Sequence, residues 1–288
     1  MIPGPMSETP ILAVEDLIVR YRGRHRETIA LNGISFALGQ ERLGIVGESG
    51  SGKTTIGRAL LRLLPPGTEV TARRLDFAGQ DLRALDEAAM RNIRGRRISM
   101  VLQDPKFSLN PVMTVGRQIA ESYRVHHRAS RKEAKERALA MLAELSIREP
   151  GKVFDLYPHE VSGGMGQRVM IAMMLVPEPA LLIADEPTSA LDVTVQAQLL
   201  TLIDALIRRR GMALLLISHN INLVASFCDR VMVMYAGRVM ETCRAADLDE
   251  ARHPYTRGLL ACRPVVDETR EELATLARDP RWLEAAEP

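Results

Sequence analysis

The sequence is poor in aromatic residues and cysteine, and its charges nearly cancel. Phe, Trp and Tyr make up 4% of the 288 residues, which argues against a surface on which nucleic-acid bases stack. Lys and Arg number 38 against 36 Asp and Glu, so the net charge of +2 implies no strongly charged polymer as a partner. Cys228, Cys243 and Cys262 form no CxxC pair, which argues against a disulfide scaffold or zinc module and favours a reducing compartment.

Long hydrophobic runs are also missing. The longest stretch without Asp, Glu, Lys or Arg covers residues 211–228, and His219, Asn220 and Asn222 stand in its middle. A membrane span needs about 20 mostly apolar residues, and these polar groups would be unpaired in lipid. Residues 1–10 contain no apolar segment typical of a signal peptide. We therefore expect a soluble protein that associates with a membrane through a partner.

What is present is a globular composition, with 46% apolar and 26% charged residues. Short runs rich in Val, Ile and Leu are apolar throughout rather than alternating, which predicts strands buried on both faces. They are residues 42–46, 98–102, 180–184, 213–217 and 231–234. Two helical patterns lie between them. One covers residues 54–64 and has Leu63 on its apolar face, and the other covers residues 193–209, from a cap at Asp192 to Gly211. This alternation predicts an α/β domain with a mainly parallel core sheet.

Two regions break the alternation. Residues 12–19 and 31–38 predict hairpin strands of an N-terminal antiparallel β layer. Between residues 105 and 177 the strand pattern disappears, which predicts an α-helical subdomain inserted between two strands of the sheet. A capping box at Ser130 and Glu133 opens one of its helices. The residues of that helix expected to face inward are Ala134, Ala138, Met141 and Leu145.

One segment matches the P-loop pattern GxxxxGK[ST] and stands between a predicted strand and a predicted helix. Its residues are Gly47, Glu48, Ser49, Gly50, Ser51, Gly52, Lys53 and Thr54. Glycines allow the backbone N–H groups to face phosphate oxygens, and the helix N-terminus adds a favourable dipole. Lys53 would supply a charge to the β- and γ-phosphates, and the Thr54 hydroxyl can ligate Mg²⁺. The segment predicts a nucleotide phosphate site.

Two further segments carry polar groups suited to the same chemistry. Asp185 and Glu186 end an apolar strand, where Asp185 could hold Mg²⁺ through its water shell and Glu186 could act as general base. Ser162, Gly163 and Gly164 expose backbone N–H groups at a helix N-terminus, which suits an anion. Taken alone, each is equally an ordinary strand end with solvated acids or an ordinary helix cap.

The order and spacing of these three segments resemble the ATP-binding-cassette (ABC) ATPases. The resemblance implies that Gln103 senses Mg²⁺ and the γ-phosphate, and that His219 hydrogen-bonds the γ-phosphate. It also implies that Thr55 adds to the P-loop contacts and that Tyr21 stacks on adenine. Residues 189–192 match the family's D-loop, which contacts the opposite subunit.

The match is closer to the oligopeptide, dipeptide and nickel importer branch. The segments that carry this resemblance are residues 157–165, 189–198 and 253–260. The resemblance implies an ABC domain over residues 11–265, with the helical subdomain at about 105–177, and leaves residues 266–288 as a charged C-terminal extension.

Three departures from the branch pattern stand out. Gly166 replaces a usual arginine, and Asn220 replaces the usual aspartate after the switch histidine. The tail after Cys262 lacks the cysteine cluster that many members carry, so we expect no iron–sulfur cofactor.

The resemblance implies an ATPase that uses ATP and Mg²⁺ to energise uptake of peptides or a related small solute, nickel included. Its expected partners are a second ABC ATPase subunit, identical or different, two membrane permease subunits and, indirectly, an external solute-binding protein, with no nucleic acid. It would lie peripherally at the cytoplasmic face of the inner membrane. Two alternatives stay open: a soluble ABC ATPase of DNA repair or translation, and a small-molecule kinase, which would fit the P-loop alone.

Overall fold

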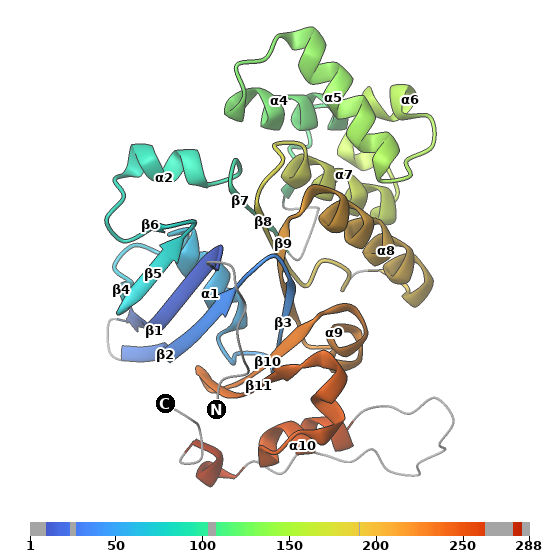
Figure 1. The fold of residues 1–288 in the computed structure, drawn as a ribbon. Coiled ribbons are helices and arrows are strands. Elements are labelled where there is room, and N and C mark those ends of the chain that lie inside the picture. The colour runs from blue at the N-terminus through green and yellow to red at the C-terminus, as the bar shows by residue number, and fades with distance from the viewer. Residues whose placement is uncertain (1–9, 24–26, 103–107, 190, 263–278, 284–288) are drawn as a thin grey trace. The chain divides into compact units, whose positions relative to one another are not determined.

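The computed structural model describes residues 10–23, 27–102, 108–189, 191–262 and 279–283 (Figure 1). The chain divides into two compact units. The first unit comprises residues 1–84 and 215–288, and the second comprises residues 85–214.

The first unit contains an antiparallel sheet with the strand order β2-β1-β5-β6, in which β4 also pairs with β1. Its strands are β1 (Leu12–Arg22), β2 (Glu27–Leu38), β4 (Glu69–Thr71), β5 (Arg74–Phe77) and β6 (Gln80–Asp81). Leu12 pairs with Leu38 in antiparallel register, which confirms the predicted antiparallel layer. Both hairpin strands are longer than predicted, because the backbone pairing of β1 with β2 continues through polar residues as far as Arg22, which pairs with Glu27.

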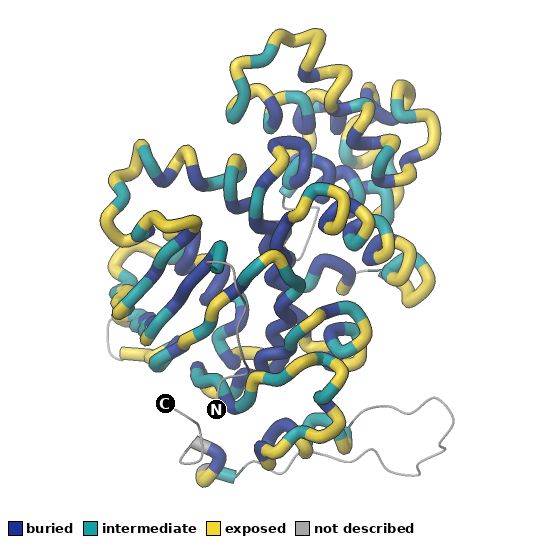
Figure 2. Tube along the Cα trace, in the orientation of Figure 1, coloured by how far each residue is buried: buried dark blue, intermediate teal, exposed yellow. Residues whose placement is uncertain are grey.

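The first unit also contains strands in the order β11-β10-β3-β9. They are β3 (Arg42–Val46), β10 (Arg230–Tyr235), β11 (Arg238–Arg244) and β9 (Ala213–Ser218), which continues into the second unit. β3 and β10 pair in parallel and are buried along most of their length (Figure 2). The helical elements of this unit are α1 (Lys53–Leu60), α9 (Ile221–Phe227), η2 (Ala245–Glu250), α10 (Pro254–Ala261) and η3 (Pro280–Leu283).

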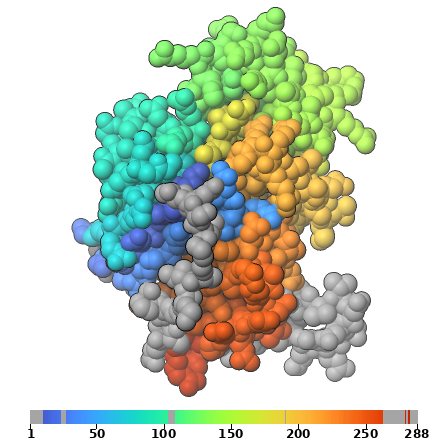
Figure 3. Space-filling model, viewed as in Figure 1, coloured from blue at the N-terminus to red at the C-terminus, as the bar shows by residue number. Residues whose placement is uncertain are grey.

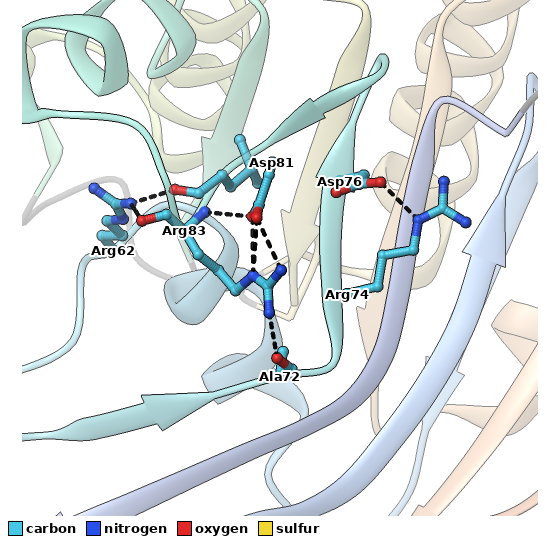
Figure 4. A network of polar contacts seen from close by, with 7 residues as sticks. Arg62, Ala72, Arg74, Asp76, Asp81 and Arg83 are labelled. Carbon is cyan, nitrogen blue, oxygen red and sulfur yellow. Dashed lines mark hydrogen bonds and ion pairs between the residues drawn. The ribbon is translucent and has the colours of Figure 1, made fainter.

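Helix α1 ends earlier than predicted. The helical pattern extended to residue 64, but Arg62 has a left-handed backbone with φ 50° and Leu63 is 52% exposed instead of facing the core. Long-range bonds hold this turn, because the Arg62 guanidinium donates to the carbonyls of Leu82 and Arg83 (Figure 4). The prediction for Leu63 was wrong because these partners are distant in sequence.

The segment that receives Arg62 is itself fixed by a second arginine. Arg83 donates to the Asp81 carboxylate and to the Ala72 carbonyl, and so joins the residues after β6 to those before β5 (Figure 4). The hydrogen bond from Arg83 holds the pKa of Asp81 below its usual value.

The second unit contains strands in the order β9-β8-β7. β7 (Ile98–Val101) and β8 (Leu181–Asp185) pair in parallel and are buried throughout, as predicted for a covered sheet. The helical elements are α2 (Glu87–Ile93), α4 (Val115–His126), α5 (Arg131–Glu144), α6 (Pro150–Phe154), η1 (Pro158–Glu160), α7 (Gly163–Leu175) and α8 (Val193–Arg210). Residues 108–177, all of which are described, contain helices and no strand.

The predicted helix caps of this unit are present. The Ser130 hydroxyl accepts from the Glu133 N–H at 3.1 Å, and the four residues predicted to face inward, the last of which caps the end of α5, are buried. The Asp192 carboxylate accepts from the Val195 N–H at 2.9 Å, and Gly211 ends α8 at a φ of 59°. Among the described residues, no helix is both long enough and apolar enough to cross a membrane.

Close packing between α4 and α6 gives a prediction about stability. A Cβ added at Gly116 would overlap the ring of Phe154, which is 6% exposed, so Gly116→Ala should lower the free energy of unfolding by about 1–3 kcal/mol. Gly151→Ala in α6 is the matched control, because a Cβ there meets no heavy atom of the described residues within 4 Å. Urea titration should show a lower midpoint for Gly116→Ala alone, and equal midpoints would contradict the packing argument.

Candidate functional site

The P-loop, residues 47–54, connects β3 to α1 in a tight turn. The Ser51 N–H donates to the Glu48 carbonyl at 3.2 Å, and the Thr55 N–H donates to the Gly52 carbonyl at 3.0 Å. Gly50 and Gly52 have φ values of 81° and 99°, in the left-handed region that favours glycine. At Gly52 a Cβ would also lie 2.6 Å from the Ala30 carbonyl oxygen, so the sequence pattern reflects both backbone conformation and close packing.

Lys53 occupies the inside of this turn. Its side chain is 8% exposed, and its ammonium donates to the carbonyls of Gly47 and Glu48, each at 2.8 Å, and to the Ser51 hydroxyl at 3.4 Å. A buried ammonium must be hydrogen-bonded, so these acceptors fix its position. Thr54 and Thr55 follow in the first turn of α1 and are half-buried. A positive charge at the N-terminus of a helix suits a polyphosphate.

Two segments that are distant from the P-loop in sequence, both in the first unit, form hydrogen bonds with it. The Gly237 N–H, in the turn between β10 and β11, donates to the Ser51 carbonyl at 3.1 Å. The Glu48 N–H donates to the Tyr255 hydroxyl at 3.3 Å. Neither contact was predicted. The segment 253–260 was singled out by resemblance, but its sequence carries no sign of contact with the P-loop.

Asp185 and Glu186 stand at the carboxyl end of β8, as predicted. Asp185 is 5% exposed, and Glu186 has a φ of 49°, a conformation uncommon for a residue with a side chain. The Ser189 N–H and hydroxyl both donate to the Glu186 carbonyl, at 3.3 and 3.2 Å. Gln167, in α7, donates its amide N–H to the Pro187 carbonyl. The turn that bears the two acids is therefore held on both sides.

Ser162 caps α7, and its hydroxyl accepts from the Met165 N–H at 3.3 Å. Ser162 and Gly163 are exposed, while Gly164 is half-buried. At Gly166 the nearest described heavy atom to an added Cβ is Val161 Cγ2, at 4.0 Å. Packing among the described residues therefore does not require glycine in place of the arginine usual in the branch.

Of the other predicted site residues, some lie on strands or at helix caps and one lies outside the described residues. His219 is exposed directly after β9, and Asn220 caps α9 by accepting from the Leu223 N–H at 3.1 Å. An aspartate would make the same cap, so the departure at Asn220 preserves this contact. Tyr21 is half-buried on β1, opposite Thr28. Gln103 lies outside the described residues.

The first unit thus contains Tyr21, the P-loop, Thr55 and His219, and the second contains Ser162–Gly164, Asp185 and Glu186. No group of three or more His, Cys, Asp or Glu side chains suited to a metal ion occurs among the described residues. The Thr54 hydroxyl and the Asp185 carboxylate are nevertheless each a hard oxygen donor, the ligand type that Mg²⁺ prefers.

Comparison with known proteins supplies the family. The family model described as "ABC transporter" matches residues 31–189. The chain belongs to the ABC transporter family. A probable peptide ABC transporter ATP-binding protein of Sinorhizobium fredii is 51% identical over 257 residues, which cover 88% of this chain and 77% of the relative. The oligopeptide transport ATP-binding protein OppD of Bacillus subtilis is 45% identical, over 93% of this chain and 75% of the relative.

A solved structure agrees with this family. The dimeric post-hydrolysis state of the ATP-binding cassette MJ0796, bound to ADP and phosphate, superposes with a TM-score of 0.73. The sequences are 26% identical, and the match covers 81% of this chain and 98% of that one. The predicted ABC family and α/β P-loop fold are confirmed, and the chain is an ATP-binding, ATP-hydrolysing member of that family. The small-molecule kinase alternative is excluded by this membership.

Lys53→Ala should weaken ATP binding. The substitution removes a charge held inside the P-loop, and hydrogen bonds from charged groups contribute about 1.5–3 kcal/mol, so the Kd for ATP should rise roughly 10- to 100-fold. Lys152→Ala is the matched control, because the Lys152 side chain is 76% exposed on α6. Isothermal titration calorimetry should separate the two variants. Equal affinities would contradict the phosphate site.

Proposed function

We propose that the chain is the ATPase subunit of an importer that takes up peptides or a related small solute. The observation that carries this proposal is the 51% identity, over 88% of the chain, to a protein named as a probable peptide ABC transporter ATP-binding protein. The names of further relatives, an oligopeptide and a dipeptide transport protein, point the same way. They favour an importer over the soluble ATPase of DNA repair or translation.

The P-loop residues would bind the nucleotide. Backbone N–H groups of the P-loop, with Thr55, would donate to phosphate oxygens, and Lys53 would place its charge at the β- and γ-phosphates. Tyr21 would stack on adenine. Thr54, Gln103 and Asp185 would hold Mg²⁺, which when bound would neutralise charge on these phosphates.

The hydrolytic step would rest on two further side chains. Glu186 would accept a proton from the attacking water, and His219 would donate a hydrogen bond to the γ-phosphate. The constrained backbone at Glu186, fixed through Ser189, supports a role in which the carboxylate must be aimed.

Dimerisation would complete each site. Ser162, Gly163 and Gly164 would present their N–H groups to the γ-phosphate bound by a second ABC ATPase subunit, and the D-loop would contact that subunit. The dimeric cassette with ADP and phosphate supports this arrangement by likeness. The dimer would lie at the cytoplasmic face of the inner membrane and drive two permease subunits. An external solute-binding protein would deliver the solute to these permeases.

Glu186→Gln should preserve ATP binding and slow hydrolysis. The amide keeps the shape of the side chain but cannot accept the proton, and general-base catalysis contributes about 10²- to 10⁴-fold. Glu178→Gln is the matched control, because Glu178 also has a left-handed backbone, with φ 59°, and precedes β8. Phosphate-release assays should show the loss for Glu186→Gln alone, and near-normal turnover would refute the assignment of the base.

Ser162→Arg should abolish hydrolysis and ATP-dependent dimerisation while leaving ATP affinity in the monomer unchanged. A bulky cation at an exposed helix start would block approach of the second subunit, whereas the P-loop of the same chain stays intact. Ser130→Arg is the control, because Ser130 caps α5 with the same hydroxyl contact. Both variants should lose about 1 kcal/mol of stability through the cap. Normal turnover in Ser162→Arg would reduce Ser162 to a helix cap.

A further inference from the structure

One peptide group of the P-loop is held at both ends by side chains. The Glu48 N–H donates to the Tyr255 hydroxyl at 3.3 Å, and the Gly47 carbonyl accepts from the Lys53 ammonium at 2.8 Å. These two groups belong to the same peptide unit, which is planar and rigid. Fixing the direction of its N–H therefore fixes the direction of its carbonyl, and with it the acceptor that Lys53 faces.

The Gly47 backbone also requires glycine for this peptide to adopt its orientation. Its φ is 154°, and a Cβ there would overlap the Met234 carbonyl at the end of β10. The peptide is thus confined by packing on one side and by Tyr255 and Lys53 at its polar ends.

Tyr255 is itself fixed. Its side chain is fully buried, and its N–H donates to His253 Nδ1 at 3.1 Å. The Glu241 carboxylate of β11 accepts from the N–H groups of Arg252 and His253, at 2.7 and 3.2 Å, and so ties the start of α10 to the strand. The tyrosine hydroxyl is therefore presented to the P-loop by a rigid support.

The C-terminal turn η3 completes that support. Trp282, the single tryptophan of the sequence, is 8% exposed and packs against Tyr255 and Tyr235, with ring centroids 5.3 and 5.6 Å away. The ring centroids of Tyr235 and Tyr255 are 4.7 Å apart. We call these three residues the aromatic cluster. By the colour bar, η3 is the red segment near the orange β11 and α10 in the ribbon of Figure 1, and its red atoms lie next to the orange ones in Figure 3.

We propose that Tyr255 is a positioning residue for Lys53, acting through the Gly47–Glu48 peptide, and that the aromatic cluster links the C-terminal turn at Trp282 to the P-loop. The inference rests on the proposed role of Lys53 in binding phosphate. The Tyr255 hydroxyl polarises the peptide by accepting its N–H, which strengthens the carbonyl as an acceptor for the ammonium. The hydroxyl also prevents rotation of the peptide. The Lys53 ammonium therefore stays bound to the Gly47 carbonyl when its other N–H groups turn from Glu48 and Ser51 to phosphate.

Tyr255→Phe tests the hydroxyl without removing the ring. We expect the Kd and KM for ATP to rise about two- to tenfold, as for loss of one hydrogen bond, with kcat at saturating ATP within twofold of wild type. Tyr123→Phe is the matched control, because Tyr123 is also buried and its hydroxyl donates to Glu133 at 3.4 Å. Unchanged ATP affinity in Tyr255→Phe, with normal affinity in the control, would overturn the proposal.

A double-mutant cycle tests the route through Lys53. In a Lys53→Ala background Tyr255→Phe should change the Kd for ATP by less than twofold, because the group that it positions is gone. An equal fold-change in both backgrounds would mean that Tyr255 acts independently of Lys53 and would overturn the proposal. If Lys53→Ala alone left affinity unchanged, the phosphate site itself would fail, an outcome distinct from failure of Tyr255 alone.

The fluorescence of Trp282 tests the link between the P-loop and the C-terminal turn. If the aromatic cluster only stabilised the fold, ATP would not change this fluorescence. ATP with Mg²⁺ should alter the intrinsic tryptophan emission of the wild type, and Tyr255→Phe, saturated with ATP, should show less than half that change. Trp282→Phe gives the background signal from nucleotide absorption and tyrosine. No ATP-dependent change in the wild type, or an undiminished change in Tyr255→Phe, would overturn the link to the C-terminal turn.

Discussion

The buried ammonium of Lys53 is the constraint around which the first unit is organised. A lysine that is 8% exposed requires hydrogen-bond acceptors at fixed positions, and the turn supplies two carbonyls and a hydroxyl. Those acceptors are available because the glycines permit left-handed backbone and close approach to β2 and β10. The turn between β10 and β11, which donates to Ser51, and Tyr255 then hold the loop from outside. The position of Lys53 thus depends on β2, β10 and Tyr255 as well as on the loop itself.

Much of this fold follows from local sequence patterns. The uniformly apolar strands, the caps at Ser130 and Asp192, and the terminating Gly211 were predicted because each depends on neighbours within a few residues. The end of α1 was not, because Arg62 leaves the helix to bind carbonyls some twenty residues away. An apolar periodicity that includes Leu63 carries no information about that competition.

In the site, too, the sequence predicts what depends on neighbouring residues and misses what depends on distant ones. The P-loop pattern identifies Lys53 and its glycines, because the required backbone conformations are written in the residue types. The supports at Gly237 and Tyr255 depend on long-range packing, for which a single sequence gives no pairing rule. At Asn220 the sequence departs from the branch pattern, and the structure shows that the departure preserves the helix cap.

Helix α7 contacts two segments for which we propose separate functions. Its first residue follows the Ser162 cap, and its Gln167 donates to the carbonyl of Pro187, the residue after Glu186. Gln167 is 1% exposed, so its amide has no rotameric freedom to follow an independent motion of that turn. A helix transmits displacement along its axis as a rigid element, and Ser162 and Gln167 are little more than one turn apart. The same short helix therefore begins at the Ser-Gly-Gly segment and holds the turn that bears Glu186, so the two segments share one rigid support.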